Sequence, residues 1–255
     1  MLRSLAEGAM FGETWGDGPP QVLVLHGWRR THADFVASVG PRSPGGALAV
    51  LAPDLPGFGA TPAPRTAWGS VDYAAALEQV LEAEAPGRRL VVVGHSLGGR
   101  IAVQLAARRP DAVGALVLTG APLAARPGKP RRSRAAFRLV RALRRAGVVS
   151  EARLERARQR HGSEDYRAAT GTMREVLVRI VNERYDEVLT AVRCPVELVW
   201  GDDDREAPLE VARAIEDQVP DAVVTVCEGA GHLVPVTAPH ALRAAVDRAL
   251  ARQSP

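Results

Sequence analysis

The chain has 255 residues, which is long enough to bury a sizeable hydrophobic core. Apolar residues make up 46% and charged residues 24%, as is typical of a soluble globular protein. No stretch reaches the roughly 18 apolar residues of a membrane-spanning helix, and the first residues lack the apolar segment of a signal peptide. Two cysteines suit a reducing compartment, so we predict a cytoplasmic protein without a membrane span.

The net charge of +4 is modest but unevenly distributed. Arginine and lysine are frequent from Arg126 to Arg160, where the only acids are Glu151 and Glu155. A basic stretch can recruit anionic substrates, nucleic acid or a membrane surface. Arginines that line the solvent faces of short helices give the same pattern. We favour the second interpretation and expect no nucleic-acid partner; the oligomeric state is not indicated.

Apolar, β-branched runs recur along the chain and predict buried strands. Each is nearly continuous in Val, Leu and Ala, which is typical of strands covered on both faces in a parallel sheet. The runs are, in chain order, QVLVLHG, ALAVLAPD, LVVVGHS, GALVLTG, VELVWGD and AVVTVCEGAGH.

Segments with helical periodicity alternate with these runs. They cover residues 70–85, 97–110, 208–219 and 237–252. Strands and helices in alternation predict right-handed crossover units, and therefore an α/β fold with a doubly wound, mostly parallel sheet.

About seventy residues between the fourth and fifth runs contain no convincing strand. Helical patterns lie near 133–147, 151–161 and 164–185. We interpret residues 123–192 as a helical cap, inserted between the core segments 1–122 and 193–255, over the sheet edge where open α/β folds bind ligands. In the first helix Ala136, Val140, Leu143 and Gly147 form an apolar stripe, with Arg134, Arg138, Arg141 and Arg145 facing outward. We expect a mobile lid that selects the substrate.

The sequence Gly94-His95-Ser96-Leu97-Gly98 follows a predicted strand and precedes a predicted helix. This is the context of a nucleophile elbow, a strained turn that exposes a serine hydroxyl at a helix N-terminus. The backbone N–H after the nucleophile, that of Leu97, is then a predicted oxyanion donor. Ser96 is therefore the candidate nucleophile.

A serine nucleophile needs a base and an acid that orients the base. His232, in a loop after the last predicted strand, is the candidate base. The remaining histidines are interpreted as structural or solvated; they are His26, His32, His95, His161 and His240. No carboxylate follows the fourth strand, so the acid must follow the fifth, where Asp202, Asp203 and Asp204 are consecutive. Consecutive carboxylates cannot converge on one ion, so no metal site is predicted.

In order along the chain, the motifs HGW, DLPGFGAT, GHSLGG, WGDDDREAP and GAGHLVP resemble the landmarks of the α/β-hydrolase superfamily. The resemblance covers nearly the whole chain except the cap. It implies a Gly-x-x-Asp-x-x-x-Pro pattern after the fifth strand, which selects Asp204 between Gly201 and Pro208. Asp203 is the alternative if the register differs by one. It also implies that the N–H of Trp28 is the second oxyanion donor. We expect the side chain of Asp54 to stabilise the nearby backbone rather than to take part in the chemistry.

These residues predict a cofactor-independent serine hydrolase that cleaves a carboxylic ester or a related small acyl compound through an acyl-enzyme. Hydrolysis of C–C bonds, lactones or thioesters and perhydrolysis use the same triad and stay open. A non-catalytic ligand-binding protein of the same fold and a basic-surface interaction protein are the alternatives from other classes. No nucleotide-binding glycine motif is present.

We also expect no disulfide between Cys194 and Cys227. The first begins one predicted strand and the second ends its predicted parallel neighbour. The two would lie roughly 15–20 Å apart along the strand direction, whereas a disulfide needs Cα atoms within about 7 Å.

Overall fold

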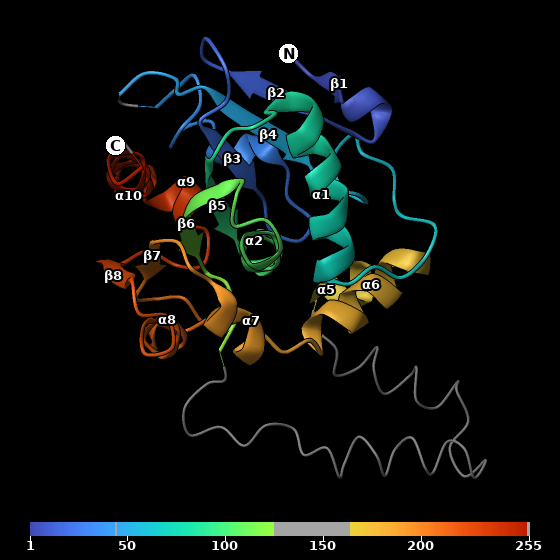
Figure 1. Ribbon diagram of the computed structural model, residues 1–255. Coiled ribbons are helices and arrows are strands. Elements are labelled where there is room, and N and C mark those ends of the chain that lie inside the picture. Colours follow the sequence, from blue (N-terminus) through green and yellow to red (C-terminus); the bar gives the residue numbers. More distant parts are fainter. Residues whose placement is uncertain (44, 125–163, 254–255) are drawn as a thin grey trace, which may run out of the picture.

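The protein is described here by a computed structural model, which covers residues 1–43, 45–124 and 164–253. Its centre is an eight-stranded sheet in the order β1-β2-β4-β3-β5-β6-β7-β8 (Figure 1). The strands are β1 (Arg3–Leu5), β2 (Met10–Trp15), β3 (Val22–Leu25), β4 (Val50–Asp54), β5 (Leu90–His95), β6 (Val113–Thr119), β7 (Val196–Gly201) and β8 (Ala222–Cys227).

Strands β3 to β8 are all mutually parallel, and they correspond to the six predicted apolar runs. Strands β1 and β2 were not predicted; they pair with each other and extend the sheet antiparallel to β4. The sequence MFGETW of β2 mixes buried and partly exposed positions, so it lacks the continuous apolar pattern of the central strands. The prediction of a doubly wound, mostly parallel α/β sheet is confirmed.

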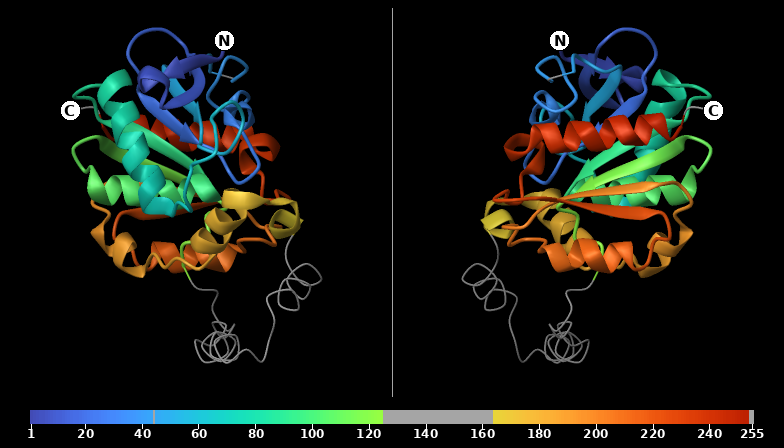
Figure 2. Two further views of the ribbon diagram at one scale, coloured as in Figure 1. Left: turned by 90° about the vertical axis from the view of Figure 1, so that its right-hand side faces the viewer. Right: turned by 90° about the vertical axis from the view of Figure 1, so that its left-hand side faces the viewer.

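Helices cover both faces of the sheet (Figures 1 and 2). One apolar cluster includes residues of α1 (Ser70–Glu84), α2 (Leu97–Arg108) and α8 (Leu209–Glu216). A second cluster, on the other face, includes residues of the short helix η2 (His32–Phe35), α9 (Val234–Thr237) and α10 (Pro239–Ala251). None of the helices in the described part of the chain is long and apolar enough to cross a membrane.

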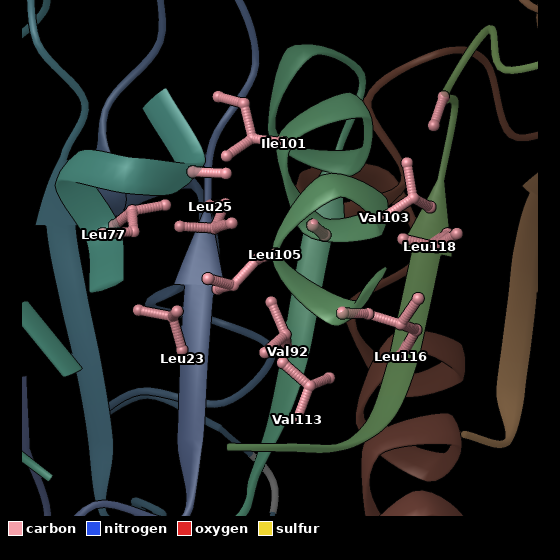
Figure 3. Close-up of a cluster of buried hydrophobic side chains, with 14 of the residues drawn as sticks. Leu23, Leu25, Leu77, Val92, Ile101, Val103, Leu105, Val113, Leu116 and Leu118 are labelled. Carbon is pink, nitrogen blue, oxygen red and sulfur yellow. The ribbon is translucent and has the colours of Figure 1, made fainter. Parts of the chain in front are cut away.

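Helix α2 is the central packing element of the first face. Its side chains Ile101, Val103 and Leu105 are fully buried, and they lie over apolar side chains of β3, β5 and β6 (Figure 3). Tight packing of this kind resists displacement, so the N-terminus of α2 is held firmly at the carboxyl edge of the sheet.

The described part of the predicted cap forms three helices, α5 (Glu164–Ala168), α6 (Gly171–Val181) and α7 (Asp186–Ala191). The expectation of one helix over 164–185 was wrong. Thr170 is extended and Gly171 has a φ of 50°, which breaks the helix between α5 and α6. The predicted helices at 133–147 and 151–161, with their arginines, lie outside the described residues.

Helices α6 and α7 are attached to the core rather than projecting from it. Arg100 of α2 donates to the carbonyl of Ile180 and lies over the ring of Tyr185. Glu183 accepts hydrogen bonds from the Ser70 N–H at the start of α1, at 3.0 Å, and from the Tyr185 hydroxyl, at 2.6 Å. This end of the predicted cap is therefore fixed against α1 and α2.

Both cysteines are buried and free. Cys194 precedes β7, whereas Cys227 is paired in register with Gly201 at the opposite end of that strand. The expected strand placement is thus the observed one.

Candidate active site

Ser96 lies at the turn between β5 and α2, with a φ of 51° and a ψ of −106°. A non-glycine residue rarely adopts this left-handed region, and such strain gathers at functional sites. The Ser96 N–H donates to the carbonyl of Thr119 at 2.9 Å, which ties the turn to the end of β6. The turn has the strained backbone and the strand-to-helix position that the sequence predicted for a nucleophile elbow.

The flanking glycines make this turn possible because backbone segments meet there. A Cβ on Gly98 would lie 1.9 Å from the carbonyl oxygen of Leu25, at the end of β3. A Cβ on Gly94 would lie 2.6 Å from the Cα of Gly99. Only glycine allows the start of α2 to approach the sheet so closely.

His232 lies in the loop after β8, and its ring is hydrogen-bonded to the acid that the family pattern selected. Its Nδ1 is 2.8 Å from Oδ2 of Asp204. The side chain of His232 is 15% exposed and that of Asp204 only 1%. A buried carboxylate at Nδ1 fixes the tautomer that leaves Nε2 free to accept a proton.

Asp204 differs from its two neighbours in what its carboxylate contacts. Its Oδ1 accepts the N–H groups of Glu206 and Ala207, each at 2.9 Å, which leaves Oδ2 for His232. Asp202 and Asp203 are exposed, and Asp202 accepts only the N–H of Gly229 at 2.7 Å. Of the three acids, Asp204 alone is turned inward toward the histidine.

The electrostatic surroundings favour a charged His232. Burial acts to lower its pKa, but the hydrogen bond and the charge of Asp204 outweigh this and hold the pKa above 6.5, with smaller contributions from Glu206 and Asp165. Glu206 contributes because its Oε2 is 3.6 Å from Nε2 of His232. The imidazolium that forms when the ring accepts a proton is therefore stabilised.

Ser96 and His232 line one pocket of about 320 Å³ at the carboxyl edge of the sheet. Its other lining residues come from the loop after β3, from the end of β5, from α5 and from the loops after β7 and β8. They are Gly27, Trp28, Arg29, Arg30, His95, Asp165, Glu206 and Leu233. The three predicted triad residues, contributed by three separate loops, thus converge beside one cavity.

The predicted oxyanion residues lie on two sides of Ser96. Leu97 is the first residue of α2, where the N–H has no partner within the helix. Trp28 lines the pocket, and its ring packs edge-on against Phe58 at 4.9 Å. The indole Nε1 is buried without a hydrogen-bond partner among the described residues. Arg29 follows with a φ of 55°, a second strained residue at this pocket.

The profile of the Alpha/beta hydrolase family matches residues 22–245, which include all of these site residues. The chain belongs to this family. The predicted family and fold are thereby confirmed.

Three similarities place this α/β hydrolase among named proteins. It is 43% identical over 110 residues to Lipase LipV of Mycobacterium tuberculosis, a match that covers 40% of this chain and only 37% of the lipase. It is 31% identical to a pimeloyl-[acyl-carrier protein] methyl ester esterase of Chromobacterium violaceum, over 88% of this chain and 91% of that one. A thermophilic esterase from Thermogutta terrifontis superposes with a TM-score of 0.71 at 22% identity, covering 99% of both chains, and shows the fold.

Three further histidines of this α/β hydrolase, His26, His32 and His240, lie outside the pocket-lining set. His26 accepts the Leu55 N–H at Nε2, at 2.9 Å, and burial lowers its pKa to about 4. His32 is paired through Nδ1 with Asp54 at 2.7 Å. His240 is exposed on α10, and His161 lies outside the described residues. Asp54 also accepts the N–H groups of His32 and Ala60, and so holds backbone as expected.

Sequence reasoning missed several residues that line the pocket, among them Arg29, Asp165, Glu206 and His95. Arg29 reaches from the loop after β3 to Glu164 at 3.2 Å and Asp165 at 3.6 Å, which joins that loop to α5. Glu206 was within reach of inference, since it follows Asp204 by two residues. His95 was assigned away from the site because the elbow aims adjacent side chains in different directions, yet it lines the pocket. The described residues contain no cluster of three His, Cys, Asp or Glu side chains that could hold a metal ion.

Proposed function

We propose that this α/β hydrolase cleaves a carboxylic ester or a related small acyl compound with Ser96 as nucleophile, His232 as base and Asp204 as orienting acid. The observation that carries the proposal is the 2.8 Å contact between His232 and the buried Asp204, beside a pocket that also contains the strained Ser96. A nucleophile elbow and an acid-oriented histidine at one cavity are the requirements of acyl transfer by serine.

The reaction has two halves. Ser96 Oγ attacks the carbonyl carbon while its proton passes to Nε2 of His232, and the same proton then leaves with the alcohol or thiol. The remaining acyl-enzyme is attacked by water, which gives its proton to Nε2, and Ser96 is regenerated with release of the acid. The N–H groups of Trp28 and Leu97 hold the oxyanion in both halves, a contribution of about 3–4 kcal/mol per donor.

Esters lead the candidate substrates because relatives across most of the chain bear that activity in their names, including a methyl ester esterase. Lactones, thioesters and activated C–C bonds are further members of the same reaction class. We also propose that residues 123–192 act as a cap that sets substrate choice. The ion pairs of Arg29 with Glu164 and Asp165, across the pocket from one element to the other, support this.

The experiment combines covalent labelling with turnover. A fluorophosphonate probe should label wild type at Ser96, and Ser96→Ala should lose both the labelling and the hydrolysis of p-nitrophenyl esters of varied acyl length. Ser4→Ala is the matched control, because Ser4 is exposed on the edge strand β1, outside the pocket-lining set. Labelling that persists in Ser96→Ala would contradict the assignment of Ser96 as the nucleophile. Lactones, thioesters and dicarbonyl compounds in the same panel then define the substrate class.

We further propose that the protein works in a reducing compartment, the cytoplasm, since its two cysteines are unpaired and buried. Burial raises the pKa of Cys194 to about 11, so this thiol is unreactive in the folded protein. Two thiols should titrate after denaturation without reductant, and fewer in the folded state. A count of zero after denaturation would contradict the strand placement of both residues.

A further inference from the structure

His95 is a buried imidazole beside the pocket to which the proposed mechanism gives no role. It ends β5, directly before Ser96, and is 1% exposed. Its Nδ1 lies 3.3 Å from the carbonyl oxygen of Thr119, which also accepts the Ser96 N–H at 2.9 Å. A carbonyl can only accept, so Nδ1 carries the proton. The ring is therefore fixed in one tautomer by the strand that also supports the nucleophile.

This ring occupies the space between two parts of the site. On one side it is 4.9 Å from the ring of His232, at an interplanar angle of 57°. On the other it lies against Gly27, where a Cβ would come within 2.9 Å of Cδ2. Gly27 precedes Trp28, the proposed oxyanion donor. His95 thus lies against both the proposed base and the residue that precedes this donor.

The ring of His232 is also held by Asp204 and restricted by Gly120. Asp204 holds its Nδ1, and Gly120 lies so close that a Cβ there would be 2.9 Å from Cε1. One hydrogen bond leaves rotation about its axis free, whereas contacts with His95 and Gly120 restrict the ring further. Misplacement of a reacting group by about 1 Å can cost about 100-fold in rate, so this support matters for proton transfer.

His95 also stays neutral while charge develops nearby. Burial and the charge of His232 lower the pKa of His95 to about 3. An imidazolium on His232 therefore forms beside a neutral ring and meets no like charge. Asp204, Glu206 and Asp165 face His232 with negative charge, and Arg30 is the cation whose charge reaches His95.

We propose that His95 is a positioning residue, a neutral imidazole wedge that sets the place of His232 relative to Ser96 and to the Gly27–Trp28 loop. The inference rests on the proposed function, because it assigns His95 a role in the reaction of the same site. In this role His95 itself neither accepts nor donates a proton during the reaction.

The test compares two replacements at this position with an exposed control. His95→Ala removes the ring, His95→Phe keeps a ring of similar size without the imidazole nitrogens, and His240→Ala alters a solvent-facing histidine. For each variant we would measure kcat and KM on one p-nitrophenyl ester over a range of pH, the thermal midpoint, and fluorophosphonate labelling of Ser96.

His95→Ala should lower kcat by about 10- to 100-fold, with KM within about threefold. The acid limb of its pH profile should move to higher pH, because water in the vacated space weakens the burial that opposes protonation of His232. His95→Phe should keep most of kcat and the wild-type limb, and His240→Ala should match wild type. A folded His95→Ala variant with an unchanged kcat and an unchanged acid limb would overturn the proposal. A folded His95→Phe variant with a kcat as low as that of His95→Ala would also overturn it.

Gly27→Ala tests the same wedge from the other side if His95→Ala does not fold. Its methyl group would push the ring toward His232, and kcat should fall by about tenfold or more. Where His95→Ala does not fold, a folded Gly27→Ala with an unchanged kcat would overturn the proposal. Where His95→Ala folds, the double variant Gly27→Ala/His95→Ala should be faster than the product of the two separate losses predicts, because removal of the ring leaves room for the methyl group. Losses that multiply would overturn the proposal. Failure of the proposed function looks different: wild type itself would show neither hydrolysis nor labelling of Ser96.

Discussion

Two histidine–aspartate pairs in this protein have nearly the same geometry and different surroundings. His232 and Asp204 meet at 2.8 Å, and His32 and Asp54 meet at 2.7 Å, each through Nδ1. In both pairs the histidine side chain is 15% exposed and the carboxylate is buried. The hydrogen bond by itself therefore does not distinguish a catalytic pair from a structural one.

The difference lies in what surrounds each bond. His232 lines the pocket that contains Ser96, so its Nε2 is available to a reacting group. His32 is not among the residues that line this pocket. Otherwise the two pairs are alike: each Nε2 has a second carboxylate nearby, Glu13 at 4.0 Å and Glu206 at 3.6 Å. Each aspartate also accepts two backbone N–H groups. Our proposal gives the catalytic role to His232 and Asp204 because Ser96 and a cavity lie beside them, and a structural role to His32 and Asp54. Removal of each pair should expose this contrast.

The largest expected effect comes from Asp204→Asn. An amide at this position cannot hold the imidazole in the productive tautomer, so kcat should fall by about 10⁴-fold while the fold persists. Asp203→Asn is the matched control and should stay within a few-fold of wild type, because Asp203 is exposed. Steady-state kinetics and thermal melts separate the two effects. A large loss of kcat in Asp203→Asn together with a wild-type kcat in Asp204→Asn would assign the orienting acid to Asp203 instead.

Asp54→Ala should act on stability instead. It leaves the His32 and Ala60 N–H groups and the His32 ring without their acceptor, at a cost of about 2–4 kcal/mol in the free energy of unfolding. The kcat per folded molecule should change by less than about threefold. Denaturant titration and active-site labelling measure the two quantities. Loss of catalysis without loss of stability would make the second pair part of the active site.

The pH dependence of catalysis sharpens the comparison further. His232 must be neutral to accept a proton, and its pKa lies above 6.5, so kcat/KM should fall as the pH drops through a value above 6.5. Glu206→Gln removes one of the charges that raise this pKa and should move the acid limb to lower pH. Glu210→Gln, exposed on α8, is the control and should leave the limb in place. An acid limb below 6.5 in wild type would contradict the electrostatic description.

The smallest expected effect is the pH dependence of stability from the structural pair. The hydrogen bond to Asp54 raises the pKa of His32 above 6.5, against the effect of burial, while the pKa of Asp54 is lowered. The stabilisation through His32 is therefore complete below pH 6.5 and is lost as the pH rises through its raised pKa. The difference in unfolding free energy between wild type and His32→Gln should be larger at pH 5.5 than at pH 9. A difference that grows with pH would show that His32 is neutral in its pair.

Much of the site could be predicted from sequence because its signals are local. An apolar run followed by Gly-x-Ser-x-Gly and a helical pattern specifies a strand, a tight turn and a helix, and Ser96 lies at that turn. The order of the motifs along the chain was sufficient to identify the family. By contrast, the N-terminal strands β1 and β2 were missed. They are stabilised by pairing, β1 with β2 and β2 with β4, rather than by an apolar pattern of their own.

The sequence by itself determined the parallel core, the elbow at Ser96 and the short set of acids from which Asp204 was chosen, since each depends on neighbours along the chain. Only the tertiary structure showed that Asp204 turns toward His232, that His95 lies beside His232 although two strands separate β5 from β8, and that Arg29, Asp165 and Glu206 line the same cavity. Those contacts join residues far apart in sequence. Their geometry follows from how the loops pack at the carboxyl edge of the sheet, and no periodicity along the chain encodes that packing.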